Sequence, residues 1–159
     1  MPTNEEVILK GLSLYCISKG NIVQDWVFAD QVGFARQLGL GAQPEAGAGE
    51  RLVRQFWENV INAHDPEAAD AIMAADYKQN ADGIAPGPGG FKEFFRDVLS
   101  GSSGMSATIE SIIDTGGIVV STTTISFSTP PEGWAETQTI VDVFRTNGQK
   151  LTEHWDLRV

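Results

Sequence analysis

The chain has 159 residues, and its 21 acidic against 11 basic side chains give a formal charge of −10 at pH 7. This charge repels phosphate backbones and anionic lipid surfaces, so we expect neither nucleic acid nor a membrane as partner. The single cysteine, Cys16, excludes an internal disulfide, and no Cys/His cluster has the spacing of a metal site. Acidic residues near the start and the lack of a long apolar run predict a cytoplasmic protein.

The first forty residues form a separate segment in the pattern. Residues 7–17 are apolar and ambiguous between strand and helix, and GNIVQDWVFAD (20–30) predicts a strand. The apolar spacing of residues 31–40 predicts a short amphipathic helix. A Gly- and Ala-rich stretch follows, which predicts an appendage over 1–40, a linker over 41–49 and a main domain over 50–159.

The next part of the chain has helical spacing. ERLVRQFWENVINAH (50–64) repeats apolar residues at helical intervals. Asp65 and Pro66 suit the N-cap and first turn of a second helix, expected to end near Ala75. The remaining expectations here are a short strand over 76–80, a Pro- and Gly-rich loop over 81–90 that neither element can extend through, and a third helix over 91–99.

From Met105 onward the pattern changes to alternation. Four strands are predicted over 106–114, 118–128, 134–145 and 150–159. They are separated by TGG, PPEG and NG, which are turn sequences typical of an antiparallel meander. Helices followed by a sheet predict an α+β fold.

The order of these elements, with the motifs DYKQNADG, GFKEFF, VDVFR and EHWD, resembles the SnoaL-like branch of the nuclear-transport-factor-like superfamily. That branch includes polyketide cyclases, and the superfamily includes ketosteroid isomerase. The resemblance implies a cone-like curved antiparallel sheet, wrapped by three helices around an apolar pocket, and a homodimer. GNIVQDWVFAD echoes GQKLTEHWDLRV (148–159) and resembles the closing strand of such a domain. Residues 1–40 would then be a pocket lid, an element for a partner subunit or the remnant of a duplication.

Alternation places the polar residues of the last two strands on shared faces. Gln138, Asp142 and Phe144 share one face, and His154, Asp156 and Arg158 share a face of the next strand. Alternation does not tell which face is interior. The resemblance to ketosteroid isomerase places Asp142 at the position of the protonated Asp in its oxyanion hole, and therefore inside the pocket.

A carboxyl group in an apolar pocket has a raised pKa and can donate a proton or a hydrogen bond to a developing oxyanion. We therefore take Asp142, His154 and Asp156 as candidate catalytic residues, with His154 and Asp156 as base and orienting partner. In the alternative interpretation His154 and Asp156 pair with each other, or with Arg145 or Arg158, as buried structural groups.

Further candidates would line the pocket. Trp57 falls at the position of the isomerase's oxyanion-hole Tyr, but its indole N–H is no acid. Asn80 stands where SnoaL-like sequences often have His, and the isomerase's base position falls near Ala81 or Asp82, so the expected base is missing. The predicted ligand-binding residues are Trp57, Tyr77, Asn80, Phe94, Gln138, Phe144 and Arg158.

These features predict an enzyme that uses acid/base chemistry without cofactor or metal. Its substrate would be a small, largely apolar carbonyl-type molecule, and it would be a cyclase, isomerase, dehydratase or hydrolase. The alternative is a non-catalytic module for ligand binding or dimerisation, which the missing base favours. A third interpretation, a relative of epoxide hydrolases, needs an Asp–Arg–Asp set. Arg145 is predicted on the wrong face for that, which leaves Arg158.

Overall fold

The computed structural model describes residues 6–29, 34, 37, 47–81 and 83–158, and it divides the chain into two compact units, Met1–Ala46 and Gly47–Val159. The predicted linker lies outside the described residues up to residue 46, and so does most of the helix predicted over 31–40. Because a helix begins at Ala48, the end of the predicted linker, residues 48–49, is corrected to helix.

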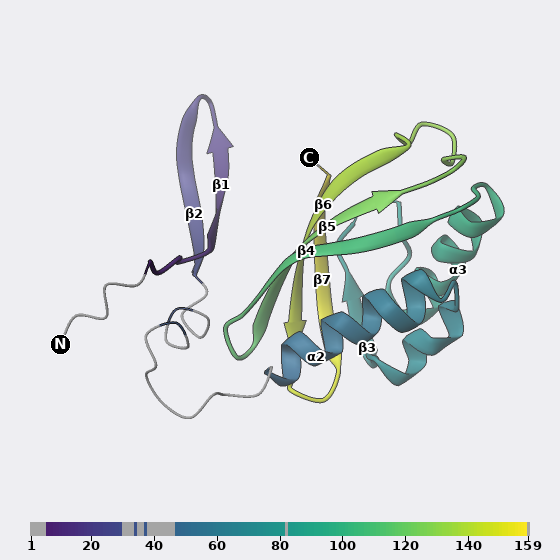
Figure 1. The fold of residues 1–159 in the computed structure, drawn as a ribbon, viewed down its shortest axis with the longest axis horizontal. Coiled ribbons are helices and arrows are strands. Elements are labelled where there is room, and N and C mark those ends of the chain that lie inside the picture. The colour runs from purple at the N-terminus through teal and green to yellow at the C-terminus, as the bar shows by residue number, and fades with distance from the viewer. Residues whose placement is uncertain (1–5, 30–33, 35–36, 38–46, 82, 159) are drawn as a thin grey trace. The chain divides into compact units, whose positions relative to one another are not determined.

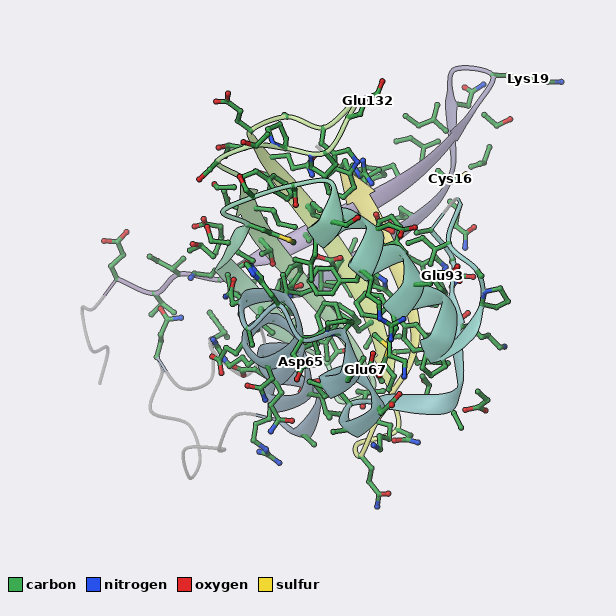
Figure 2. All side chains as sticks on the ribbon, turned by 90° about the vertical axis from the view of Figure 1, so that its right-hand side faces the viewer. Cys16, Lys19, Asp65, Glu67, Glu93 and Glu132 are labelled. Carbon is green, nitrogen blue, oxygen red and sulfur yellow. The ribbon has the colours of Figure 1, made fainter. Side chains whose placement is uncertain are left out.

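The first unit contains an antiparallel hairpin of β1 (Gly11–Ser18) and β2 (Asn21–Ala29). Lys19 and Gly20 connect the strands with φ of 51° and 79°, the left-handed conformation that two-residue hairpin turns require. Lys19 lies at the tip of this hairpin (Figure 2). Residues 11–17 of the segment that was ambiguous in the sequence are therefore strand, whereas residues 7–10 are in neither a strand nor a helix.

The second unit begins with three helical segments, two of which depart from the prediction. The predicted first helix is α2 (Ala48–Gln55), which continues as the π-helix η1 (Phe56–Asn62). The second is a 3₁₀ helix, η2 (Pro66–Ala71), whose N-cap Asp65 accepts a hydrogen bond from the Glu67 amide. The sequence had extended this helix to Ala75, but residues 73–75 belong to strand β3 (Met73–Gln79), since Met73 pairs with Leu151. Strand pairing thus overrides the local helical pattern.

Helix α3 (Gly87–Ser100) also begins earlier than predicted. The loop expected over 81–90 therefore ends at Pro86, because GPGG forms the first turn of the helix. Proline is tolerated there, since the first amides of a helix have no partner inside it. The side chain of Lys92 forms ion pairs with Glu67 and Asp70, which fastens α3 to η2.

The sheet has five strands in the order β3-β7-β6-β5-β4 (Figure 1). Strands β4 (Ser106–Asp114), β5 (Ile118–Ser126), β6 (Thr137–Thr146) and β7 (Leu151–Arg158) form the predicted antiparallel meander. The largest differences in bounds are that β5 ends before residues 127–128 and that β6 begins three residues after Trp134. Strand β3 pairs parallel with β7 at the edge, a contact that the sequence did not predict.

The helical segments lie together on one side of the curved sheet (Figure 1), which is the expected α+β cone. Side chains of α2, η1 and α3 pack with those of the facing strands into one hydrophobic core. Its fully buried members among the described residues include Val53, Val60, Val119, Phe144 and Leu151. No helix in the described ranges is long and apolar enough to cross a membrane.

Candidate functional site

A cavity of about 460 Å³ lies between the helical segments and the concave face of the sheet. Its aromatic lining comes from η1, α3 and the loop before β6: Phe56, Trp57, Phe91, Phe94, Phe95 and Trp134. The polar lining comes from the end of β3 and from β6 and β7: Gln79, Asn80, Asp142, His154, Asp156 and Arg158. The cavity thus has aromatic surface on one part of its wall and a compact polar cluster on another.

At the centre of the polar cluster is a buried acid–imidazole pair. Asp142 on β6 and His154 on β7 are 3% and 6% exposed, and their Oδ1 and Nε2 atoms are 2.9 Å apart. Burial raises the pKa of Asp142 because water no longer stabilises the charged form; the hydrogen bond with His154 opposes this rise, and the charge of Asp156 adds to it. The second carboxyl oxygen, Oδ2, is buried and has no hydrogen-bond partner. Asp142 therefore belongs to the cavity lining, while its Oδ2 atom is enclosed by protein.

The other ring nitrogen of His154 contacts strand β3. Its Nδ1 lies 2.9 Å from Gln79 Oε1, and the Tyr77 hydroxyl donates to the same oxygen at 3.0 Å. Asn80 holds the backbone of this histidine, because both its main-chain N–H and its amide Nδ2 donate to the His154 carbonyl, each at 3.0 Å. The imidazole is thus held from both sides. It also stacks on the ring of Phe144, with centroids 4.5 Å apart.

Asp156 is the cross-strand neighbour of Asp142, and its buried Oδ1 has no partner. The predicted alternative, in which His154 and Asp156 pair with each other or with an arginine, is not what the described residues show. His154 pairs with Asp142, Arg145 pairs with Glu153, and Arg158 lies over the Trp134 ring at 3.9 Å. The site therefore places two carboxyl groups and one imidazole side by side.

The structure brings together seven of the ten predicted site residues. Trp57, Asn80, Phe94 and Arg158 line the cavity with the three catalytic candidates. The lining does not include Tyr77, Gln138 or Phe144. Tyr77 and Phe144 are buried behind the wall, where they contact Gln79 and His154 respectively, because the polar cluster itself separates them from the cavity.

Sequence reasoning missed Gln79 and Trp134. Strand alternation could have found Gln79, since it shares a face with Tyr77 two residues earlier. Trp134 was placed in a strand, whereas it lies in the loop before β6 and contacts Phe94 and Phe127. Trp57, by contrast, is fixed as expected for a cavity wall, because its indole N–H donates to the buried Ser121 hydroxyl at 3.3 Å. No group of three His, Cys, Asp or Glu suited to a metal ion occurs among the described residues.

Comparisons with known proteins agree with this fold. The family model of the SnoaL-like domain matches residues 53–154. TsrD from Streptomyces laurentii superposes with a TM-score of 0.62 at 20% identity, covering 70% of this chain and 87% of that chain. A putative polyketide cyclase from Acidithiobacillus ferrooxidans reaches 0.61 at 20% identity, covering 72% and 90%. An LEH-like epoxide hydrolase from M. tuberculosis reaches 0.58 at 20% identity, covering 73% and 86%. A search of curated proteins finds no significant match.

Proposed function

Because its residues 53–154 match the family model, the chain belongs to the SnoaL-like domain family, and we propose that it is a cofactor-independent acid/base enzyme acting on a small, largely apolar carbonyl compound. The observation that supports this most directly is the Asp142–His154 pair in the wall of a largely apolar cavity. A buried ionisable pair that faces a cavity is the usual arrangement of acid/base catalysts.

The two neighbouring carboxyl groups, Asp142 and Asp156, can take the separate roles of acid and base. Asp142 and Asp156 are cross-strand neighbours on β6 and β7. It is unfavourable for both carboxyl groups to be charged at once where the cavity wall excludes water. One carboxyl in its acid form can hydrogen-bond to the carbonyl oxygen, while the other takes the proton from the adjacent carbon. His154 adds a third group to this chemistry, because its imidazole can accept and release a proton beside Asp142.

The rest of the cavity suits an apolar body. Aromatic side chains from η1 and α3 provide a water-poor surface, which strengthens every electrostatic interaction inside. Arg158 is the exposed cation of the lining, and it lies over Trp134. The expected reactions are proton transfers next to a carbonyl group that lead to cyclisation, isomerisation or dehydration. The putative polyketide cyclase among the structural neighbours supports this class.

Epoxide hydrolysis has less support. The interpretation needs an arginine between two aspartates, yet Arg145 forms its ion pair with Glu153 on the other face of the sheet. Arg158 forms a cation–π contact with Trp134, and no carboxylate pairs with it among the residues that the structure describes. The neighbouring epoxide hydrolase therefore shares the fold with this chain, and the hydrolase reaction is not our proposal.

A non-catalytic binding module is the second candidate, and one observation favours it. Asn80 occupies the place of the expected base, and its amide is committed to the His154 carbonyl and to Glu153. In that case the cavity would hold a ligand without turning it over.

The test uses 2-tetralone, a small apolar ketone with exchangeable protons next to its carbonyl. Proton NMR in D₂O follows their exchange, and tryptophan fluorescence follows binding, since Trp57 and Trp134 line the cavity. We expect Asp142→Asn to lower the catalysed exchange by about 10²–10⁴-fold, the usual contribution of a general acid or base, with binding retained. The exposed Asp76→Asn is the control. Binding without exchange in the wild type would support the binding module instead.

A further inference from the structure

We propose that Gln79 and Tyr77 are positioning residues that keep the proton on Nδ1 of His154, so that Asp142 and His154 Nε2 share a single proton. The inference rests on the proposed function, and it assigns the position of the proton within the same site. Neither residue would touch the reacting atoms of the substrate, since both act through the imidazole ring.

The backbone creates this contact. Strands β3 and β7 pair in parallel, and in their register Gln79 lies beside His154. The Gln79 amide oxygen is 2.9 Å from His154 Nδ1 and 3.0 Å from the Tyr77 hydroxyl oxygen. Tyr77 is only 2% exposed, and His154 continues the chain to Asp142 Oδ1 at 2.9 Å. Four side chains on three strands thus form one continuous series of hydrogen bonds.

The chemistry of the amide oxygen determines the tautomer. A carbonyl oxygen can only accept a hydrogen bond, so His154 Nδ1 must donate to Gln79 Oε1. A neutral imidazole carries one N–H, so Nε2 is then an acceptor and Asp142 Oδ1 must carry the proton between them. The doubly protonated ring opposite a carboxylate satisfies the same contacts. The neutral form with the proton on Nε2 would bring two lone pairs together at Gln79, and it is therefore disfavoured.

Tyr77 contributes to the orientation of the Gln79 amide. With Oε1 facing the histidine, the phenol donates to that oxygen, which accepts from both the hydroxyl and Nδ1. Burial, followed by the negative charges of Asp142 and Asp156, raises the pKa of Tyr77 above its ordinary value. The phenol of Tyr77 therefore stays protonated and remains a hydrogen-bond donor at neutral pH.

This arrangement gives Asp142 a defined role. With the shared proton between Oδ1 and Nε2, the acceptor left on this carboxyl is Oδ2, which is enclosed in the wall and must become exposed when the substrate binds. As the C–H bond next to the carbonyl breaks, the proton binds to Oδ2, its electron pair passes into the carbonyl group to give the enolate, and the Oδ1 proton moves to Nε2. The reverse transfer returns the proton to the product. Gln79 supports this relay because it remains hydrogen-bonded to Nδ1–H throughout.

The experiment is ¹⁵N NMR of histidine-labelled protein, which distinguishes protonated from unprotonated ring nitrogens. The chain has only two histidines, so His64→Gln assigns the signals. We expect wild-type Nδ1 to remain protonated when the ring is neutral. Gln79→Met, which removes the acceptor, should move the proton to Nε2 and lower 2-tetralone exchange at least about 10-fold, the effect of losing an outer hydrogen-bond partner of a functional histidine.

Two further variants keep the test decisive if Gln79→Met does not fold. Gln79→Glu retains an acceptor and should restore Nδ1 protonation and most of the rate, whereas Tyr77→Phe should give a mixture of both tautomers. The exposed Gln149→Met should change neither signal. An unprotonated Nδ1 in the wild type, or an unchanged tautomer in Gln79→Met, would overturn the inference. Because the NMR signals need no turnover, they remain informative even if 2-tetralone is not exchanged and the proposed function fails.

Discussion

Substituting Phe144 by Leu tests whether this ring supports the site from behind the wall. Phe144 is fully buried, and it contacts the Phe56 ring edge-on at 5.4 Å and the His154 ring face-on at 4.5 Å. Each aromatic pair contributes about 0.5–1.5 kcal/mol beyond the burial of its area, so losing both lowers the free energy of unfolding by about 1–3 kcal/mol. Leucine keeps the apolar character of the position, which limits any further loss to the volume removed.

Urea denaturation followed by tryptophan fluorescence measures this change, with Phe94→Leu as the matched control. Phe94 is a half-buried ring of the cavity lining, and its aromatic neighbour Trp134 is 6.4 Å away. We expect the control to lower stability less and to weaken binding of 2-tetralone more, because its ring faces the ligand directly. Equal losses of stability in the two variants, or weaker binding only in Phe144→Leu, would refute this account of the wall.

Three other predictions concern the pH dependence, the helix entry and the extent of the core. Burial raises the pKa of Asp142 above 3.8, so the unfolded chain releases this proton at a lower pH and the wild type loses stability as the pH rises. The stability of Asp142→Asn relative to wild type should therefore increase between pH 3 and 7 in urea titrations; a decrease would contradict the shift. Gly90→Ala should lower the free energy of unfolding by about 1–3 kcal/mol, because a Cβ at this position meets the Ala85 carbonyl oxygen. Gly89→Ala is the control, because a Cβ there meets no other atom. Equal melting temperatures of the two variants would disprove this. A chain of residues 47–159 should still unfold cooperatively by circular dichroism, because all buried core residues among those described lie within it; a gradual transition would argue against that.

Much of the fold follows from local signals in the sequence. The alternation over β4 to β7 and the turns between them specify an antiparallel meander, because each turn brings consecutive strands side by side. The predictions were wrong where a segment distant in the sequence determines the local structure. Residues 73–75 have a helical pattern, yet Met73 pairs with Leu151, nearly eighty positions away. At α3 the glycines and proline suggested a loop, whereas the first helical turn tolerates them because its amides need no partner within the helix.

The same distinction between local and distant contacts applies to the candidate site. Asp142 and His154 belong to consecutive antiparallel strands, so alternation and the resemblance to ketosteroid isomerase together placed them on one interior face. Gln79 reaches the same imidazole only through the parallel contact between β3 and β7. Parallel neighbours are joined by long connections, and the sequence between residues 79 and 154 contains no local sign of which strands will meet. The proximity of Asp142 and His154 could therefore be predicted from sequence, whereas the contact of Gln79 with the imidazole required the assembled sheet.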